Sequence, residues 1–424
     1  MAKAKKEWTV LVWMAGDNDL EDFSLTDLQE LKKVGSTSKV DVFAQIDSMR
    51  DDHTLRYHVR KGTTVKDDVV MDLGETNTGD PKVAIDFFTW GIAESPAKRY
   101  LMVIWNHGSG IDETDIYRRA SRFRGAGGPA KLTITRRAAP EQGQIAQRRL
   151  RTALSSRFRR SLFASTLTTA LKPPRPNARA IAYDDSARDF LDNLELAKVL
   201  AAVKTKLKRK IDLVGFDACL MNMIEVAHQL RGSADFITGS EELEPGDGWP
   251  YDRVLADLVA KPSMSAAQLG TVIVNRYVAA YKGDTVTLSL LDLAKSPAVV
   301  QAVDKLAAAL ITALKQGELG AITKAAKDAQ RFDTKDFLDL GDLAAQLAKR
   351  CKSREVKSAA KAVAAALKGA FVAAEKHTGT TVARATGVSI YCPIIVRESK
   401  MVYNRLAFAK DSRWDEFLTA YDKA

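Results

Sequence analysis

Short apolar runs alternate with helical patterns along the first half of the chain. The runs are rich in β-branched and aromatic residues and lie at 9–14, 40–46, 54–60, 100–105, 180–183, 211–216 and 236–239. Between several of them, as at 20–34 and 82–94, apolar residues recur every three or four positions, which is typical of a helix with one buried face. Strands that alternate with helices predict an α/β fold with a mostly parallel central sheet sandwiched by crossover helices.

From about residue 264 the pattern changes. Ala, Lys and Leu dominate at helical spacing, and only 285–292 and 388–391 keep the composition of strands. We therefore expect an α/β core over residues 1–290 and a mainly helical C-terminal subdomain over residues 291–424, packed on that core.

One segment of the core interrupts this pattern. Residues 117–180 contain five of the twelve prolines, a Gly-Ala-Gly-Gly-Pro stretch and no long apolar period. Such a composition cannot bury enough apolar surface to offset the entropy of ordering, so it predicts a flexible insertion.

The charge of the chain is concentrated in the same segment. The net charge is +11, with 64 basic and 53 acidic residues, which alone would suggest an anionic partner. Residues 118–179 hold sixteen basic residues and one acidic residue, whereas the remainder has 48 and 52. The segment therefore carries +15 and the rest of the chain −4, so the basic excess belongs to the insertion.

Three cysteines, Cys219, Cys351 and Cys392, are too few and too widely spaced for a disulfide framework or a CxxC metal site. We expect a reducing, cytoplasmic location and inert packing roles for Cys351 and Cys392. No run of about eighteen apolar residues is uninterrupted, so we expect no membrane-spanning helix.

Two strongly apolar predicted strands each lead into a chemically reactive residue. His107 follows the strand at 100–105, and Cys219 follows the strand at 211–216. In an open parallel sheet, functional groups gather beyond the carboxyl ends of the strands. If the two strands are neighbours, His107 and Cys219 can form a dyad for acyl transfer, and the backbone amides of Gly108 and Cys219 can stabilise an oxyanion.

Several motifs, in order, resemble the clostripain family of caspase-like cysteine peptidases. They are TVLVWMAGDNDLE at the start, strand-NHG at 106–108, AYDD at 182–185, Asp-x-Cys at 217–219 and EPGDGWPYD at 244–252. The resemblance covers roughly the first 290 residues apart from the insertion. It implies a caspase-like fold and an endopeptidase that cleaves after Arg or Lys.

The resemblance also implies site roles. His107 and Cys219 would be the catalytic dyad, and Asp217 would bind the substrate's basic side chain, with Ser240 and Glu241 forming another wall of that pocket. Asp217 could instead cap the helix that follows Cys219, and both roles can hold together. No cofactor is required. Some relatives use calcium. Two roles are open for the loop carboxylates near the crevice: they bind calcium, or they are ordinary solvated side chains. These residues are Asp17, Asp19, Asp112, Glu113 and Asp115.

Members of the family are also made as inactive chains and activated by a cut between the His and Cys halves. The insertion lies there, with Arg137, Arg149, Arg151 and Arg160 as candidate cleavage positions. We expect activation by the protein itself or by an upstream protease, with the halves held together by the shared sheet. Expected partners are proteins with exposed Arg or Lys, in a setting such as bacterial signalling or defence.

A catalytically silent scaffold that binds nucleic acid through the Arg-rich insertion is the rival hypothesis. The insertion has few interleaved aromatic residues and no recognition-helix motif, which disfavours nucleic acid. Salt-dependent binding that survives removal of 118–179 would favour the rival. No membrane partner is expected.

Overall fold

The structure is a computed structural model that describes residues 5–18, 20–50, 53–110, 181–184, 189–368, 371–393 and 403–424, with backbone alone for 181–184 and 189–190. The basic insertion, its candidate arginines, and Asp19, Asp112, Glu113 and Asp115 lie outside the described residues.

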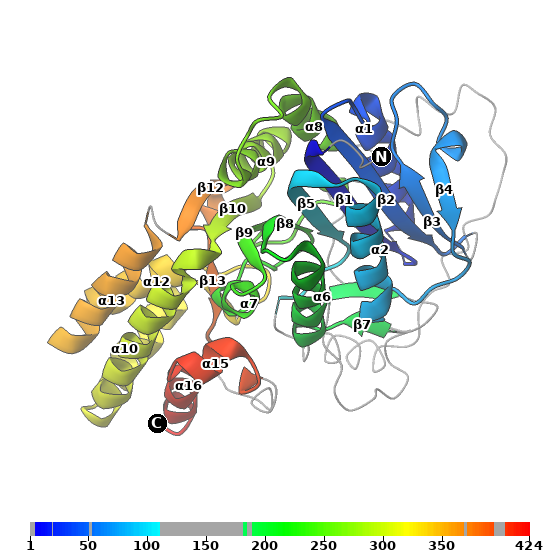
Figure 1. Cartoon of the computed structure of the whole chain (residues 1–424). Helices are drawn as coiled ribbons and strands as arrows, with labels where there is room; N and C mark the ends of the chain where they lie inside the picture. The colour runs from blue at the N-terminus through cyan, green and yellow to red at the C-terminus, as the bar shows by residue number, and fades with distance from the viewer. Residues whose placement is uncertain are drawn as a thin grey trace, which may run out of the picture.

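A nine-stranded sheet in the order β12-β10-β9-β8-β5-β1-β2-β3-β4 forms the centre of the molecule (Figure 1). Its five inner strands are parallel: β1 (Lys6–Gly16), β2 (Val40–Ser48), β5 (Ala97–Trp105), β8 (Ile211–Asp217) and β9 (Ala234–Gly239). Their central residues are buried, as their continuous apolar sequences predict. The predicted mostly parallel sheet is therefore confirmed.

Both edges of the sheet are antiparallel. On one side lie β3 (His53–His58) and β4 (Val69–Asp72), and on the other β10 (Val286–Asp292) and β12 (Val372–Thr378). The C-terminal half of the chain thus supplies β12 to the main sheet.

Helices cover both faces of the sheet. One face packs on α2 (Pro81–Glu94), α6 (Asn193–Leu207) and α7 (Ile224–Leu230), and the other on α1 (Glu21–Val34), α8 (Tyr251–Ala260) and α9 (Ala266–Ala280). Local sequence fixes several starts: Asp80 caps α2 ahead of Pro81, and Asp192 and Glu195 form a capping box on α6. The sandwich predicted from the sequence is confirmed.

The C-terminal region is mainly helical, as predicted. It contains α10 (Ser296–Lys315), α11 (Leu319–Asp328), α12 (Leu340–Arg350), α13 (Arg354–Leu367), α15 (Ala407–Asp411) and α16 (Trp414–Asp422), with a small sheet of β11 (Phe337–Asp339) and β13 (Ser389–Tyr391). The shorter elements of the chain are β6 (Ile181–Asp184), β7 (Asp189–Leu191), η1 (Lys66–Asp68), η2 (Leu293–Lys295) and η3 (Thr380–Val382). In Figure 1 helices α10, α12 and α13 lie beside the β10 and β12 end of the main sheet.

Within the described part of the chain, one stretch, Leu293–Lys315, is long and apolar enough to cross a membrane. It comprises η2 and α10. Helix α10 packs on α7, α13 and α16, and its residues Val299, Val303, Leu306 and Leu310 are buried. A core helix of a globular protein can be as long and as apolar as a membrane-spanning helix, and the packing of α10 accounts for its apolar composition.

Candidate functional site

Strands β5 and β8 place the two candidate catalytic residues at one edge of the sheet. The strands are parallel neighbours, with Trp105 paired to Asp217, and the amide of Asn106 donates to the carbonyl of Asp217 over 3.3 Å. His107 and Cys219 each stand two residues beyond this pair, so they leave the sheet in the same register. The structure thus brings together the two residues that are 112 positions apart in sequence.

Gly108 lies directly on the backbone of the candidate nucleophile. A Cβ added at Gly108 would be 2.2 Å from the carbonyl oxygen of Cys219 and 3.0 Å from its nitrogen. Only a residue without a side chain fits such an approach. The two amides expected to form an oxyanion site, those of Gly108 and Cys219, therefore belong to neighbouring pieces of backbone.

The Cys219 thiol is fully buried in the intact chain. The amide of Glu244 donates to Sγ over 3.1 Å, and Sγ lies 3.9 Å from the carbonyl oxygen of Glu244. The next residue, Leu220, has a positive φ of 62°, which is costly for a side chain with a Cβ. Its amide donates to the carbonyl of Glu242 over 3.3 Å, so residues 242–244 lie along the cysteine turn.

Asp217 is also fully buried, and its contacts show that it is not a helix cap. Its Oδ2 accepts from the Tyr251 hydroxyl over 2.8 Å and from the Trp249 amide over 3.4 Å. The helix expected near Cys219 begins only at Ile224, with Met223 at the capping position, so the capping alternative is wrong. The carboxylate lies beside the nucleophile strand and is held by α8.

Ser240 and Glu241 follow β9 at the same edge, but the Glu241 side chain turns toward the C-terminal region. Its Oε2 accepts from the Gly387 amide over 3.1 Å. Burial, followed by the nearby Asp339, raises the pKa of Glu241 well above its usual value. The Ser240 hydroxyl lies 3.0 Å from that of Thr287. Glu241 thus bridges the core to the C-terminal region through its carboxyl.

Three residues near the candidate dyad carry no role predicted from the sequence. Glu244 contacts the thiol and Tyr251 contacts Asp217, while burial raises the pKa of Tyr277 well above its usual value, with smaller contributions from Glu244, Tyr281, Asp217 and Cys219. The EPGDGWPYD motif contains two of them, so it was the available signal for Glu244 and Tyr251.

The other two cysteines, Cys351 and Cys392, are also buried. Burial raises the pKa of Cys351 to about 11 and that of Cys392 to about 12, so neither forms an appreciable thiolate near neutral pH.

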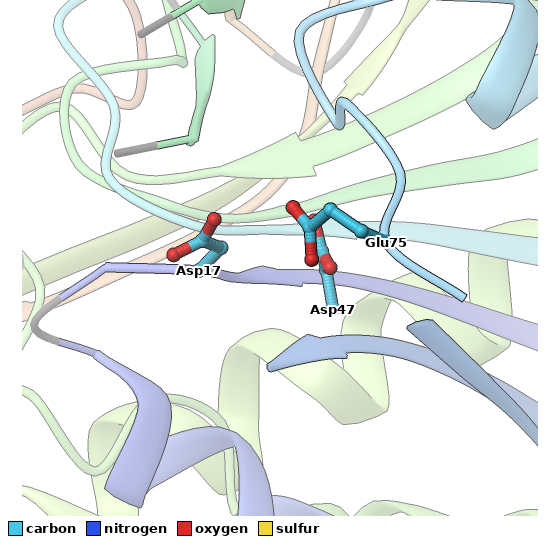
Figure 2. Close-up of side chains that lie close together, drawn as sticks. All are labelled: Asp17, Asp47 and Glu75. Atoms are coloured by element: carbon cyan, nitrogen blue, oxygen red, sulfur yellow. The ribbon is translucent and has the colours of Figure 1, made fainter. Parts of the chain in front are cut away.

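One predicted calcium-site residue, Asp17, belongs to a group of three carboxylates (Figure 2). Asp17, Asp47 and Glu75 each offer an oxygen within 4.8 Å of the others, and both aspartates are buried. Asp17 follows β1 and Asp47 lies in the last part of β2, so the group stands at the edge where β5 and β8 also end. Oxygen donors of this kind suit calcium, which takes six to eight such ligands.

Comparisons with known proteins agree with this architecture. A model of the clostripain family matches residues 12–135 and 169–421. The curated clostripain of Hathewaya histolytica is 22% identical over 363 residues, and the alignment spans 73% of this chain and 58% of that protein.

Two solved structures share the fold. A secreted C11 cysteine protease from Bacteroides thetaiotaomicron, in complex with an irreversible peptide inhibitor, has a TM-score of 0.60 at 19% identity, covering 99% of this chain and 100% of that one. An inactive zymogen C11 protease from Parabacteroides distasonis has a TM-score of 0.62 at 18% identity, covering 97% and 99%. Together with the family match, which spans most of the sequence, these likenesses confirm the resemblance: the chain belongs to the clostripain family of cysteine proteases.

Proposed function

We propose that this protein is a cysteine endopeptidase that cleaves after arginine, or lysine, with Cys219 as nucleophile and His107 as general acid and base. The observation that carries the proposal is the parallel pairing of β5 and β8, which delivers both residues to one edge in the same register. That arrangement meets the requirement of a dyad that its members lie within reach of one substrate.

The reaction follows from the two groups. The Cys219 thiolate attacks the carbonyl carbon while the amides of Gly108 and Cys219 bind the developing oxyanion. The C–N bond then breaks, and the His107 imidazolium gives its proton to the leaving amine, which leaves a thioester. Water attacks the thioester and His107 takes up its proton, so the carboxylic acid and the free thiol are released.

Asp217 supports the preference for a basic side chain. It is a buried carboxylate next to the nucleophile strand, and a guanidinium can pair with such a group through charge-assisted hydrogen bonds. Since Tyr251 and Trp249 already hold one of its oxygens, the carboxylate is oriented before substrate binds.

The intact chain is proposed to be an inactive precursor. The Cys219 thiol is fully buried against residue 244, and the +15 segment lies in sequence between the two catalytic residues. A cut in that segment, by the enzyme itself or by an upstream protease, would free the loops around the thiol. A role in a cytoplasmic signalling or defence cascade remains part of this proposal, and cell fractionation tests the location.

Mass spectrometry of purified protein, combined with a fluorogenic arginine reporter, tests the function. Wild-type protein that is cut within 118–179, by itself or by added trypsin, should hydrolyse the reporter, whereas Cys219→Ala should stay inactive after the same cut. Wild-type protein that hydrolyses the reporter as one full-length chain would overturn the precursor proposal. Reporter hydrolysis that persists in Cys219→Ala would overturn the proposed nucleophile.

We also propose that calcium, if this enzyme uses it, is held by Asp17, Asp47 and Glu75. The bound ion would offset the repulsion among three close carboxylates and so fix the loops after β1 and β2 at the proposed catalytic edge.

A further inference from the structure

A cavity of about 310 Å³ opens beside the candidate active site. Its walls come from Glu242 and Leu243 after β9, from the residue before β10, from the 331–333 loop after α11, and from η3 after β12. Because β10 runs antiparallel to both β9 and β12, its start and the end of β12 lie at the edge where β8 and β9 finish. The cavity therefore continues the catalytic edge of the sheet.

Two residues of the cavity wall also directly precede Glu244, the residue that contacts the proposed nucleophile. Glu242 and Leu243 lie between two contacts with the cysteine turn, namely the Glu242 carbonyl with the Leu220 amide and the Glu244 amide with the Cys219 thiol. Neighbouring residues of a peptide have Cα atoms only 3.8 Å apart. A substrate that reaches Cys219 thus has its adjacent side chains within range of this cavity.

The chemistry of the cavity suits a long side chain with a cationic end. Leu243 and the buried Phe332 provide apolar surface, while Glu242 and the exposed Asp333 bring two carboxylates. Arg331 is the basic residue of the lining, and its guanidinium donates to the carbonyls of Ala326, in α11, and of Lys335, in the loop after that helix. The lining therefore carries one net negative charge beside apolar surface, a combination that favours a long side chain ending in a guanidinium.

The sequence offers such a ligand. All four Arg-Arg pairs of the chain, at 118–119, 136–137, 148–149 and 159–160, fall in the basic insertion, which is the proposed site of activation. Single arginines occur throughout the chain, so adjacent pairs distinguish the insertion from the rest.

We propose that this cavity is a specificity subsite for a second basic side chain, so that the enzyme prefers an Arg-Arg pair and cleaves after its second arginine. Asp217 would bind the arginine at the scissile bond, and Glu242 with Asp333 would bind the arginine that precedes it. This inference rests on the proposed peptidase function and names its substrate more narrowly.

The test compares kcat/KM for two reporters, Arg-Arg-aminomethylcoumarin and Ala-Arg-aminomethylcoumarin, in wild-type, Glu242→Gln and Asp333→Asn proteins. We expect the wild type to prefer Arg-Arg by about fivefold, the upper end for a partly exposed ion pair, and each variant to lose most of that preference. Each variant should lose more kcat/KM for Arg-Arg than for Ala-Arg. Glu242→Gln keeps a side-chain oxygen that can accept from the amides of Leu243 and Asp333, so the substitution removes the charge without removing these two hydrogen bonds.

Glu94→Gln is the matched control, because this exposed acid lies just ahead of β5, at the opposite edge of the sheet. It should keep the full Arg-Arg preference. Equal turnover of the two reporters by wild type, or a preference that both cavity variants retain, would overturn the subsite.

Binding of a fluorescent Arg-Arg peptide to Cys219→Ala protein separates the two proposals. If wild type cleaves neither reporter but peptide binding still weakens with Glu242→Gln, the peptidase function fails and the subsite stands. If neither Glu242→Gln nor Asp333→Asn weakens binding of the Arg-Arg peptide, the subsite is rejected even if the enzyme is active.

Discussion

The backbone amide of Glu244 donates a 3.1 Å hydrogen bond to the Sγ of Cys219, and this contact covers a thiol with no exposed surface. The proposed nucleophile of the intact chain is thus held by the loop after β9 rather than presented to substrate.

Alkylation should reveal this cover. In uncut chain, Cys219 should react slowly with iodoacetamide, and after limited tryptic cleavage of the insertion it should react much faster, as peptide mapping would show. Cys351 and Cys392 are internal controls, because burial raises the pKa of each thiol and should keep both slow in either form. Rapid alkylation of Cys219 in the uncut chain would contradict a covered nucleophile.

Asp217→Asn should remove the preference for arginine while leaving the fold intact. Loss of one partner from a buried charge pair costs about 2–5 kcal/mol, so kcat/KM for an arginine reporter should fall at least about 30-fold. A citrulline reporter, which has the same shape without the charge, should change little. An equal loss on both reporters would indicate that Asp217 supports the turn and not the substrate.

Gly108→Ala should disrupt the contact between the two loops that carry His107 and Cys219. The new methyl group would lie 2.2 Å from the Cys219 carbonyl oxygen, so the backbone must move, and we expect a loss of about 1–3 kcal/mol in unfolding free energy with near-complete loss of activity.

Gly320→Ala is the control for that substitution. Gly320 lies in α11 with open space around its Cα, so alanine there should stabilise the protein by about 0.5–1 kcal/mol. Urea unfolding and reporter turnover measure both variants, and an active, fully stable Gly108→Ala protein would contradict the close approach.

Glu225, on the helix after the cysteine turn, should make stability depend on pH. It accepts from the Tyr391 amide and the Tyr403 hydroxyl, and burial raises its pKa from 4.5 to about 7. Between these values the native state holds a proton that the unfolded chain releases, so the unfolding free energy should fall by about 3 kcal/mol as pH rises from about 4.5 to 7, and then level off.

Glu225→Gln should remove that part of the pH dependence, because glutamine keeps the acceptor oxygen without the titration. Urea unfolding of both proteins at pH 5 and pH 8 measures the difference. Parallel profiles for the two proteins would show that Glu225 is charged in the folded state.

Calcium should raise the melting temperature of the intact protein if Asp17, Asp47 and Glu75 bind it. Asp47→Asn should abolish the shift, and Asp72→Asn, an exposed acid on β4, should retain it. If calcium does not change the melting temperature of the wild type, the calcium site is contradicted, whether or not the protein hydrolyses the reporter.

The sequence predicted the parts of the fold that have strong periodicity. Strands β5 and β8 are continuous apolar runs, so the sequence predicted that both are buried and where each one ends. The residues that follow these two ends are His107 and Cys219, which is why the sequence could suggest them as a pair. Strand β12 was missed, because its residues, Val-Ala-Ala-Glu-Lys-His-Thr, are half-exposed at a sheet edge and resemble the helical composition around them.

The environment of the site depends on contacts between distant segments, and a local motif can mark a residue without showing which distant residue it contacts. The carboxyl of Glu241 was expected in the substrate pocket, whereas it bonds to Gly387, 146 residues away. Likewise the hydroxyl that donates to Asp217, at the end of β8, comes from Tyr251 at the start of α8, 34 residues away. Such partners follow from the way β9, α8 and the C-terminal region come together in space.

The order of the main sheet has a consequence for the lifetime of a cleaved protein. The strands before the insertion, β1 to β5, lie on one side of the β5–β8 pairing, and β8, β9, β10 and β12 lie on the other. A cut in the insertion would therefore leave two polypeptides joined by the β5–β8 pairing and by the helix contacts α1–α8 and α2–α6 across it. Folding would then be a bimolecular reaction, with a melting temperature that depends on concentration. At low concentration a first complete unfolding would be irreversible, so the cut enzyme would persist for as long as these contacts hold.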